Sequence, residues 1–448
     1  MSTPTGKPAS SHHESSANSR RRFIRDSSWL VVGGTMASNV HLASAMHADG
    51  SDEIKVGLIG CGARGTGAAN QMLSTPGATK IVAMGDVFAD RLQACIRGLS
   101  RNREKVDVPK ERQFVGFDAY EKVLQTDCDL VILATPPGFR PLHAAAAIQA
   151  GKHVFAEKPV AVDAPGVRQI LETARLAKEK NLAFAVGLQR RHEPRYQETV
   201  ARLQTGAIGD IVLARCYWNG GGVWTRARQE NQTELEFQLR NWYYFTWLSG
   251  DHIVEQHVHN LDVINWLKQS YPVVANGQGG RQVRQGPEYG QIYDHHFVEF
   301  TYEDGTKLFS QCRHIENCWN SVTEHVHGTQ GTADISGARI KDPAGNTVWE
   351  YGKGGGKGWQ EEQHQLLGAL RAGNVPNEGE YAALSTLTAI LGRTATYSGK
   401  SVRLDDIRDS KQTLADVAKL TDLDAKPPVQ PNDDGSYPVA MPGSTKVV

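Results

Sequence analysis

The chain has 448 residues, and its 49 lysines and arginines are balanced by 49 aspartates and glutamates. This length allows two domains that each have a core of their own. The even charge, without a basic stripe or a low-complexity run, argues against nucleic acid or a membrane surface as a partner. No stretch is long and apolar enough to predict a stable membrane span.

The first 45 residues differ from the rest of the chain. Residues 1–18 are polar and rich in Ser and His, which is typical of disorder. The run Ser19-Arg20-Arg21-Arg22-Phe23-Ile24-Arg25 resembles the twin-arginine export signal, and a short apolar segment follows at residues 29–37. Ala43-Ser44-Ala45 has the form of a cleavage site. We therefore expect a signal peptide, transport by the twin-arginine export machinery and a periplasmic or otherwise exported protein. A basic disordered tail is the alternative.

The next segment has the pattern of a dinucleotide-binding unit. An apolar strand predicted at residues 54–59 runs into Gly60-Cys61-Gly62-Ala63-Arg64-Gly65. A helix-like segment follows, and a second apolar strand at residues 80–84 ends at Gly85-Asp86. This order of strand, glycines, helix, strand and acid is far more specific than the glycines alone. A glycine-rich turn without a ligand is the alternative.

The glycines and the acid have separate roles in such a unit. Gly60 permits a tight turn, Gly62 lets backbone amides approach a pyrophosphate, and Gly65 lets the helix pack closely on the strand. The N-terminus of the helix then presents free N–H groups to the phosphates. Asp86 can hold the ribose 2′-hydroxyl and repels a 2′-phosphate, so we expect NAD rather than NADP. Arg91 is the only nearby residue that favours NADP.

Strands and helices alternate as far as residue 187, which predicts a doubly wound parallel sheet. Its further strands are expected at residues 129–134, 153–156 and 182–186, and its helices at residues 142–150 and 165–180.

From about residue 210 the strands are longer and alternate polar with apolar residues, as in an antiparallel sheet. One helix is expected at residues 250–267, and two more near residues 359–372 and 381–397. The predicted fold class is α/β: a Rossmann domain over residues 52–187, then an α+β domain with a mostly antiparallel open sheet over residues 188–405. Residues 425–448 are rich in Pro, Asp and Gly and predict an extended tail.

Two further motifs make the pattern specific. With the glycine turn and Asp86, the runs Ala134-Thr135-Pro136-Pro137 and Glu157-Lys158-Pro159 resemble the Gfo/Idh/MocA family over residues 52–405. That family is named for glucose–fructose oxidoreductase and inositol dehydrogenase. The resemblance implies hydride transfer between NAD(P) and a sugar or cyclitol, and an open sheet that builds homo-dimers or homo-tetramers. It implies these cofactor-binding residues: Gly60, Gly62, Ala63, Arg64, Gly65, Asp86, Thr135, Pro136, Glu157, Lys158 and Gln189.

Lys158 is expected at the carboxyl end of a strand, where doubly wound sheets bind ligands. A lysine near a nicotinamide, partly desolvated, can orient a hydroxyl group and share its proton. We therefore predict that Lys158 contacts both cofactor and substrate. An exposed lysine at a strand end is the alternative.

A second set of chemical groups lies at residues 255–262. On a helix, Glu255, His259 and Asp262 share one face. The family has Asp-x-x-x-His-x-x-Asp at this place, with the histidine as acid/base, so the resemblance implies a catalytic role for all three and a substrate contact for His259. Glu255 stands where an Asp is usual and is the least certain. Neighbouring histidines also suggest a metal, but His257 and His259 point about 200° apart on a helix, and we predict none.

The segment that follows the last Rossmann strand, Gln189-Arg190-Arg191, resembles a part of the family that lines the cleft. Arg191 is expected to contact substrate, and a surface salt bridge is the alternative. Aromatic residues gather nearby, and they suit either a sugar platform or a core; they are Trp218, Trp224, Trp242, Tyr243, Tyr244 and Trp247.

The leading hypothesis is an oxidoreductase that transfers hydride between a sugar or cyclitol hydroxyl carbon and a tightly held NAD. An exported enzyme cannot have its cofactor recycled by cytoplasmic partners, which favours redox-neutral cycles. A first alternative is therefore an NAD-dependent glycosidase or lyase that cleaves a glycoside by transient oxidation. A second is a non-catalytic NAD- or sugar-binding protein, because a fold does not fix a function.

Overall fold

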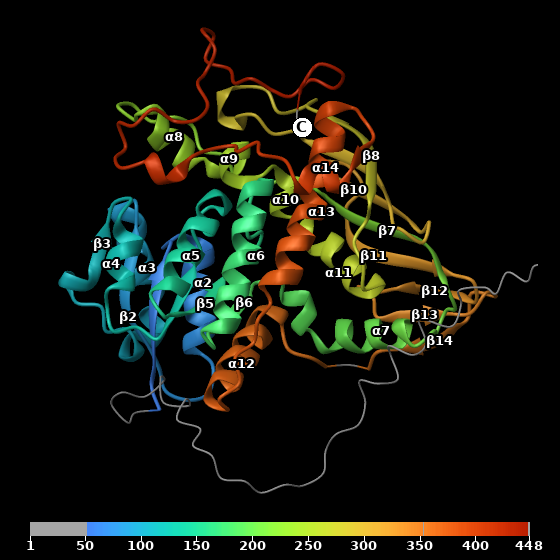
Figure 1. The fold of residues 1–448 in the computed structure, drawn as a ribbon, viewed down its shortest axis with the longest axis horizontal. Coiled ribbons are helices and arrows are strands. Elements are labelled where there is room, and N and C mark those ends of the chain that lie inside the picture. Colours follow the sequence, from blue (N-terminus) through green and yellow to red (C-terminus); the bar gives the residue numbers. More distant parts are fainter. Residues whose placement is uncertain (1–51, 353, 447–448) are drawn as a thin grey trace, which may run out of the picture. The chain divides into compact units, whose positions relative to one another are not determined.

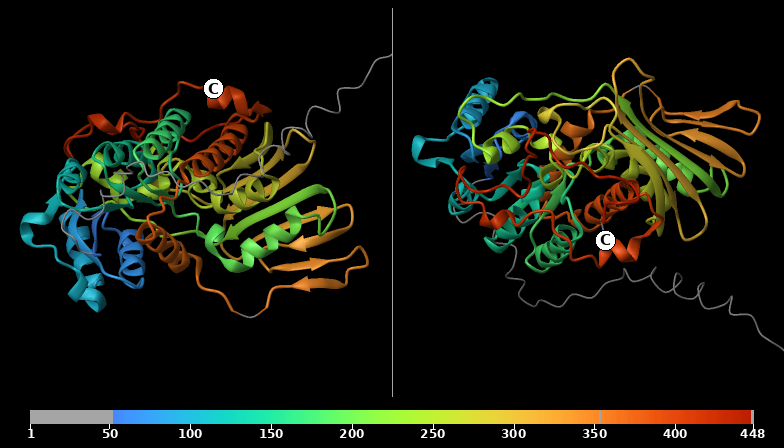
Figure 2. Two further views of the ribbon diagram at one scale, coloured as in Figure 1. Left: turned by 60° about the horizontal axis from the view of Figure 1, so that its bottom comes forward. Right: turned by 90° about the horizontal axis from the view of Figure 1, so that it is seen from above.

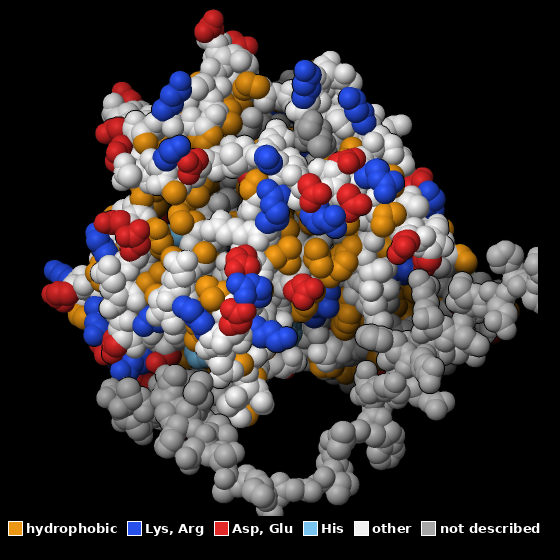
Figure 3. Space-filling view, in the orientation of Figure 1, with side chains coloured by type: hydrophobic (Ala, Val, Ile, Leu, Met, Phe, Trp, Pro, Cys, Tyr) orange, Lys and Arg blue, Asp and Glu red, His pale blue; other side chains and the backbone are white. Residues whose placement is uncertain are grey.

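A computed structural model of the chain describes residues 52–352 and 354–446 (Figure 1). The export signal expected over residues 1–45 lies outside the described residues. Over the face in Figure 3, Lys and Arg side chains lie interspersed with Asp and Glu. Among the helices of the described part, none has the length and apolar character needed to cross a membrane.

The first sheet has six parallel strands in the order β3-β2-β1-β4-β5-β6. The inner strands are mostly apolar, and β4 is entirely so, since a parallel sheet is covered on both faces. This confirms the predicted Rossmann sheet. Its strands are β1 (Ile54–Ile59), β2 (Thr79–Asp86), β3 (Gln113–Val115), β4 (Leu130–Leu133), β5 (His153–Ala156) and β6 (Phe184–Val186). Its helices are α2 (Ala63–Leu73), α3 (Ala89–Gly98), α4 (Ala119–Leu124), α5 (Arg140–Gln149) and α6 (Ala164–Glu179).

The strand order reverses direction at β1, which lies between β2 and β4. In open α/β sheets, ligands bind outside the carboxyl ends of the strands at such a point. Gly60 follows β1 there, Ala134 follows β4 and Glu157 follows β5. The fold therefore gathers three of the sequence motifs at one edge of the sheet.

The second sheet has nine strands in the order β14-β13-β12-β11-β7-β10-β9-β8-β15, and all its pairs are antiparallel except β7 with β10. The prediction of a mostly antiparallel sheet is confirmed. Its strands are β7 (Ile211–Gly220), β8 (Val274–Gly280), β9 (His295–Thr301), β10 (Lys307–His314), β11 (Ser321–Gly328), β12 (Gly331–Asp334), β13 (Arg339–Lys341), β14 (Thr347–Glu350) and β15 (Val402–Arg403).

Helices cover one face of this sheet (Figures 1 and 2). α13 (Gly379–Ser398) packs on β8 and β9 and also on α6, so it joins the two sheets. The strands show the expected alternation: in β10, Leu308, Ser310 and Cys312 are buried and their neighbours are partly exposed. The remaining helices of this part are α7 (Pro194–Gln204), α8 (Glu234–Arg240), α9 (Thr246–Ser249), α11 (Val258–Lys268), α12 (Gly358–Arg371) and α14 (Leu404–Arg408).

The helix predicted at residues 250–267 is divided into two. α10 (His252–Glu255) begins after Asp251, whose φ is 75° and whose carboxylate accepts the N–H of His252. α11 begins only at Val258, after two residues outside both helices. The side chains of Glu255 and His259 therefore do not share a continuous helical face.

Residues 409–446, called here the C-terminal strap, form little regular structure but are docked along their length (Figure 1). The N–H of Leu414 donates to Asp163 at 2.9 Å, and Gln238 of α8 donates to the Val429 carbonyl at 2.7 Å. Leu420 and Tyr437 join an apolar cluster that also contains residues of the Rossmann domain and of α8 and α9. The extended tail of the sequence prediction is thus a segment that binds both domains.

Candidate functional site

A cavity of about 460 Å³ opens between the carboxyl ends of the Rossmann strands and the segment from Val223 to Tyr243. Most of the residues predicted from sequence line it: Gly60, Gly62, Ala63, Arg64, Asp86, Thr135, Pro136, Glu157, Lys158, Gln189, Glu255 and His259. Gly65, Arg191 and Asp262 do not.

The glycine turn has the geometry that its sequence predicts. Gly60 has a φ of 94°, and a Cβ there would lie 2.6 Å from the backbone of Ala134. A Cβ on Gly65 would lie 1.9 Å from the Gly60 carbonyl oxygen, so helix and turn touch directly. Nothing lies within 4 Å of a Cβ built on Gly62. Gly62 is the N-cap of α2 and provides no side-chain cap, which leaves the helix N–H groups open to an anion.

Asp86 ends β2 at the wall of the cavity. Its carboxylate accepts the N–H groups of Cys61 at 2.7 Å and Phe88 at 2.8 Å, while burial raises the pKa of the carboxyl group. These bonds fix the carboxylate beside the glycine turn. It can still accept from a ribose hydroxyl, because a carboxylate has about four acceptor positions.

Lys158 follows β5, and its side chain, which is 13% exposed, lies beside Glu255. Its Nζ donates to the Glu255 carboxylate at 2.9 Å and to the Glu255 backbone carbonyl at 2.5 Å. Glu255 therefore holds the lysine in place and makes no recorded contact with His259. An ammonium group has three donors, so one remains for an oxygen atom in the cavity.

His259 presents a neutral imidazole to the cavity. Burial holds the pKa of His259 well below its usual value, and the positive charges of Lys158, Arg190 and Arg64 lower it further. Its ring stacks on Trp218, with centroids 5.9 Å apart. Its Nδ1 has no hydrogen-bond partner among the described residues. A neutral, unpaired imidazole beside a lysine suits proton transfer.

Asp262 and Arg191 lie elsewhere and bind each other. Arg191 donates from Nε and a terminal nitrogen to the two oxygens of Asp262, both at 2.8 Å, and the guanidinium lies 3.8 Å from the ring centre of Tyr381. Ser385 of α13 also donates to Asp262 at 2.7 Å. The structure does not bring the two residues to the cavity, because Asp262 is three residues past His259 and faces α13.

Sequence reasoning missed Arg140, which also lines the cavity. This buried arginine donates to the backbone carbonyl of Thr135 at 2.8 Å and to that of Pro159, so it ties together the ends of β4 and β5 beside Lys158. Burial lowers the pKa of Arg140 to about 10. Its position directly after Pro136-Pro137-Gly138-Phe139, past a strand end, was the only signal in the sequence.

The aromatic residues divide between the two predicted roles. Four of them line the cavity: Trp218, Trp224, Trp242 and Tyr243. Tyr244 and Trp247 are instead fully buried in apolar clusters.

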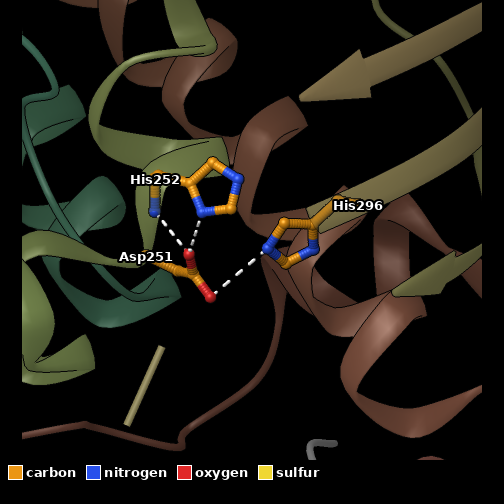
Figure 4. Close-up of side chains that lie close together, drawn as sticks. All are labelled: Asp251, His252 and His296. Carbon is orange, nitrogen blue, oxygen red and sulfur yellow. Dashed lines mark hydrogen bonds and ion pairs between the residues drawn. The ribbon is translucent and has the colours of Figure 1, made fainter. Parts of the chain in front are cut away.

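A buried cluster beneath the cavity joins Asp251, His252 and His296 (Figure 4). Nδ1 of His252 lies 2.7 Å from one Asp251 oxygen. The other oxygen accepts from the Tyr397 hydroxyl at 2.6 Å and the Tyr293 N–H at 3.0 Å, and Nε2 of His296 lies 3.3 Å away. Burial raises the pKa of the Asp251 carboxyl group, but His296 and His252 outweigh burial and hold that pKa well below its usual value. The cluster is therefore understood as an anion that orients two imidazoles.

Comparison with known proteins agrees with this geometry. The profile of an oxidoreductase family with an NAD-binding Rossmann fold matches residues 54–188, and the profile of the Gfo/Idh/MocA C-terminal domain matches residues 196–334. Together they span more than half of the chain. The chain belongs to the Gfo/Idh/MocA family.

Among the curated relatives of this family member, inositol 2-dehydrogenase 3 of Saccharopolyspora erythraea is 26% identical over 65% of the chain and 74% of the relative. Inositol 2-dehydrogenase of Acidothermus cellulolyticus is 27% identical over 52% of the chain and 60% of the relative. A solved structure of scyllo-inositol dehydrogenase from Lactobacillus casei, with NAD(H) and scyllo-inositol bound, aligns with a TM-score of 0.60 at 20% identity and covers 79% of this chain and 99% of that one. At this identity the alignment shows the shared fold.

The residues at the first sheet fit a nicotinamide dinucleotide. The open space above Gly62 and the uncapped start of α2 suit a pyrophosphate, and Asp86 suits a ribose. Lys158 and His259 lie further along the same cavity.

Two glycine variants separate this role from a purely structural one. We expect Gly62→Ala to unfold at nearly the wild-type temperature, because its Cβ meets no protein atom, but to lose at least about tenfold in affinity for NADH, since the methyl group enters the phosphate space. Gly65→Ala should instead lower the thermal stability, because its Cβ overlaps the Gly60 carbonyl. Thermal unfolding and fluorescence titration with NADH measure both effects. Unchanged NADH affinity in Gly62→Ala would place the dinucleotide elsewhere.

Proposed function

We propose that this family member is an NAD-dependent oxidoreductase that transfers hydride between a nicotinamide and the CH–OH carbon of a sugar or cyclitol. The observation that carries the proposal is the neutral imidazole of His259 in one cavity with the Glu255-bound ammonium of Lys158. The inositol dehydrogenases among the relatives support the substrate class.

The chain provides the proton chemistry of the reaction, and bound NAD provides the acceptor for the hydride. A substrate hydroxyl placed between Lys158 and His259 gives its proton to the imidazole, which is neutral and ready to accept it. Lys158 donates to the same oxygen and stabilises the negative charge that develops there. Glu255 keeps the ammonium group in place through two hydrogen bonds. Glu255 and His259 are buried, and the Lys158 side chain is 13% exposed, so all three groups are largely shielded from bulk water.

Replacement of the proposed base tests this assignment. His259→Ala should keep NADH affinity and lower kcat by about 10²–10⁴. Because burial and neighbouring charges depress the pKa of His259, the acid limb of kcat/KM in the wild type should lie below the usual histidine value of about 6.5. Steady-state kinetics against pH with myo- or scyllo-inositol and NAD measures both. His364→Ala, at an accessible site on α12, is the control. Wild-type turnover by His259→Ala would exclude this role.

The structure also supports a cofactor that is held tightly. Arg240 of α8 pairs with Asp90 of α3 at 3.1 Å, and its guanidinium lies 3.9 Å from the ring centre of Phe88. These contacts fix the Val223–Tyr243 wall against the Rossmann domain, and the C-terminal strap binds its outer side. A dinucleotide bound in the cavity would lie between this wall and the Rossmann strands. Tight retention favours a redox-neutral cycle, either between two sugars or in the cleavage of a glycoside.

We propose that the protein is exported by the twin-arginine route with its cofactor already bound. Protein purified from the periplasm should then contain about one NAD(H) per chain, detected by mass spectrometry after denaturation. Replacement of Arg20 and Arg21 by Lys should leave the protein in the cytoplasm, with the cofactor still bound. An empty protein that binds NAD reversibly would indicate an ordinary dehydrogenase, and one that binds no nicotinamide would favour the non-catalytic alternative. Net accumulation of NADH would argue against the glycosidase alternative.

The uncovered face of the nine-stranded sheet supports a homo-oligomer, which we propose as a dimer or tetramer. Phe297 on β9 is 41% exposed there and stacks on Phe309 of β10, with ring centroids 6.1 Å apart. A carboxylate in the centre of such an interface is costly to bury. Phe297→Asp should therefore shift the protein to monomers in sedimentation equilibrium, whereas Met441→Asp on the exposed strap should not. A wild-type monomer would contradict the proposal.

A further inference from the structure

Gln256 occupies the gap between α10 and α11 and lines the cavity directly after Glu255. Its side-chain oxygen Oε1 lies 2.7 Å from Nε2 of His314, the last residue of β10. The amide group of Gln256 has one acceptor and two donor hydrogens, so its orientation decides what it offers to a bound molecule. That orientation follows from the partners of His314.

The contact of the other ring nitrogen, Nδ1, shows which nitrogen of His314 carries the proton. Nδ1 of His314 lies 2.7 Å from a terminal nitrogen of Arg284. A guanidinium group can only donate, so Nδ1 must accept and carries no proton. Burial, with the nearby His252 and the charge of Arg284, holds the pKa of His314 well below its usual value, so the ring is neutral. Its single proton therefore lies on Nε2.

His314 consequently donates to Oε1 of Gln256. This leaves the amide nitrogen of Gln256 as the free end of the side chain, without a hydrogen-bond partner among the described residues. The three side chains thus form a hydrogen-bonded chain. Arg284 donates to His314, and His314 in turn donates to Gln256. The chain ends in an N–H donor at the wall of the cavity.

The start of this chain is held rigidly. Asp294 accepts the backbone N–H groups of Gln282 and Val283, both at 2.6 Å, which fixes the turn that carries Arg284. Arg284 is buried and also donates to the Tyr293 carbonyl at 2.5 Å.

His252 packs against the ring of His314 and restricts its orientation. The two ring centroids are 4.4 Å apart, and His252 is oriented by the buried Asp251 (Figure 4). The buried cluster beneath the cavity therefore also stabilises the orientation of Gln256.

Tyr243 supplies an independent indication of a polar ligand. Its ring stacks on His314 with centroids 6.1 Å apart, and it lines the same cavity. Its hydroxyl group is buried and has no hydrogen-bond partner among the described residues. A buried, unpaired hydroxyl is costly unless a ligand or a water completes it.

We propose that Gln256 is a substrate-binding residue whose amide N–H donates to a hydroxyl oxygen of a neutral polyol, next to the hydroxyl held by Lys158 and His259. Arg284 and His314 are positioning residues that keep the donor turned toward the cavity. The proposal rests on the proposed function, because it takes a vicinal hydroxyl of the same sugar or cyclitol as the ligand.

Two substitutions at Gln256 distinguish the loss of the amide N–H donor from a change in side-chain packing. Gln256→Glu keeps an oxygen for His314 but replaces the donor with an acceptor, and Gln256→Met removes both polar ends at similar size. Each should raise KM for myo- or scyllo-inositol by about tenfold or more, with kcat within about threefold and NADH affinity unchanged. Gln149→Glu, at the exposed end of α5, is the matched control. A wild-type KM in Gln256→Met, or a parallel loss of NADH affinity, would overturn the proposal.

A double-mutant cycle tests the positioning chain. Arg284→Met should raise KM about as much as Gln256→Met, and the double variant should be no worse than the poorer single variant, since both act on one hydrogen bond. Additive effects would show that Arg284 acts elsewhere. If Arg284→Met does not fold, the two Gln256 variants decide the question alone.

Binding of scyllo-inositol to the wild type and to Gln256→Met, followed by tryptophan fluorescence, separates this proposal from the proposed function. A wild type that binds the polyol but does not oxidise it contradicts the function only. Equal binding by the two proteins contradicts the role of Gln256.

Discussion

The ion pair between Lys158 and Glu255 joins the Rossmann domain to the second domain at the wall of the cavity. Lys158 follows a strand of the first sheet, and Glu255 ends a short helix of the second domain. The two side chains are only 13% and 12% exposed, so the loss of either partner would leave the other charge poorly solvated. The two domains must therefore close on each other in one arrangement for the pair to form, and that arrangement also brings His259 over the Rossmann cleft.

Two more buried ion pairs hold the segment that follows the Rossmann sheet. The short turn after the Rossmann sheet, η4 (Gln189–His192), contributes Arg190 to Glu324 of β11 and Arg191 to Asp262 of α11. Asn260 and Tyr196 complete the hydrogen bonds of Glu324 at 2.7 and 3.2 Å. Such pairs add little net stability over apolar packing, but a broken pair is costly. Their effect is to fix the turn that follows the Rossmann sheet against α11 and β11 of the second domain.

The Rossmann half of the molecule was readable from sequence because its signals are local. Gly60, Gly62 and Gly65 each solve a steric problem within a few residues, and continuous apolar runs identify strands buried on both faces. The site residues contributed by that half, such as Asp86 and Lys158, follow from their places at strand ends.

The second half was harder to predict because its site depends on distant partners. The family resemblance implied a catalytic role for Asp262 together with His259. In the structure Arg191 binds Asp262 instead, and residue spacing cannot predict that partner. The role proposed for Gln256 could not be predicted for the same reason, since its partner His314 lies 58 residues away in the sequence. The export signal and the oligomeric state remain predictions.

The interruption between α10 and α11 explains how this site uses its residues. On one continuous helix, Glu255 and His259 would lie one turn apart on the same face, and the carboxylate would be a natural partner for the imidazole. The break turns Glu255 to Lys158 instead and leaves His259 without an acidic partner in a positively charged surrounding. An unpaired imidazole stays neutral where a carboxylate-bound one would tend to be protonated. The same break places Gln256 outside both helices. This one irregularity therefore separates Glu255, which holds the lysine, from the proposed base His259 and from the amide proposed to bind the polyol.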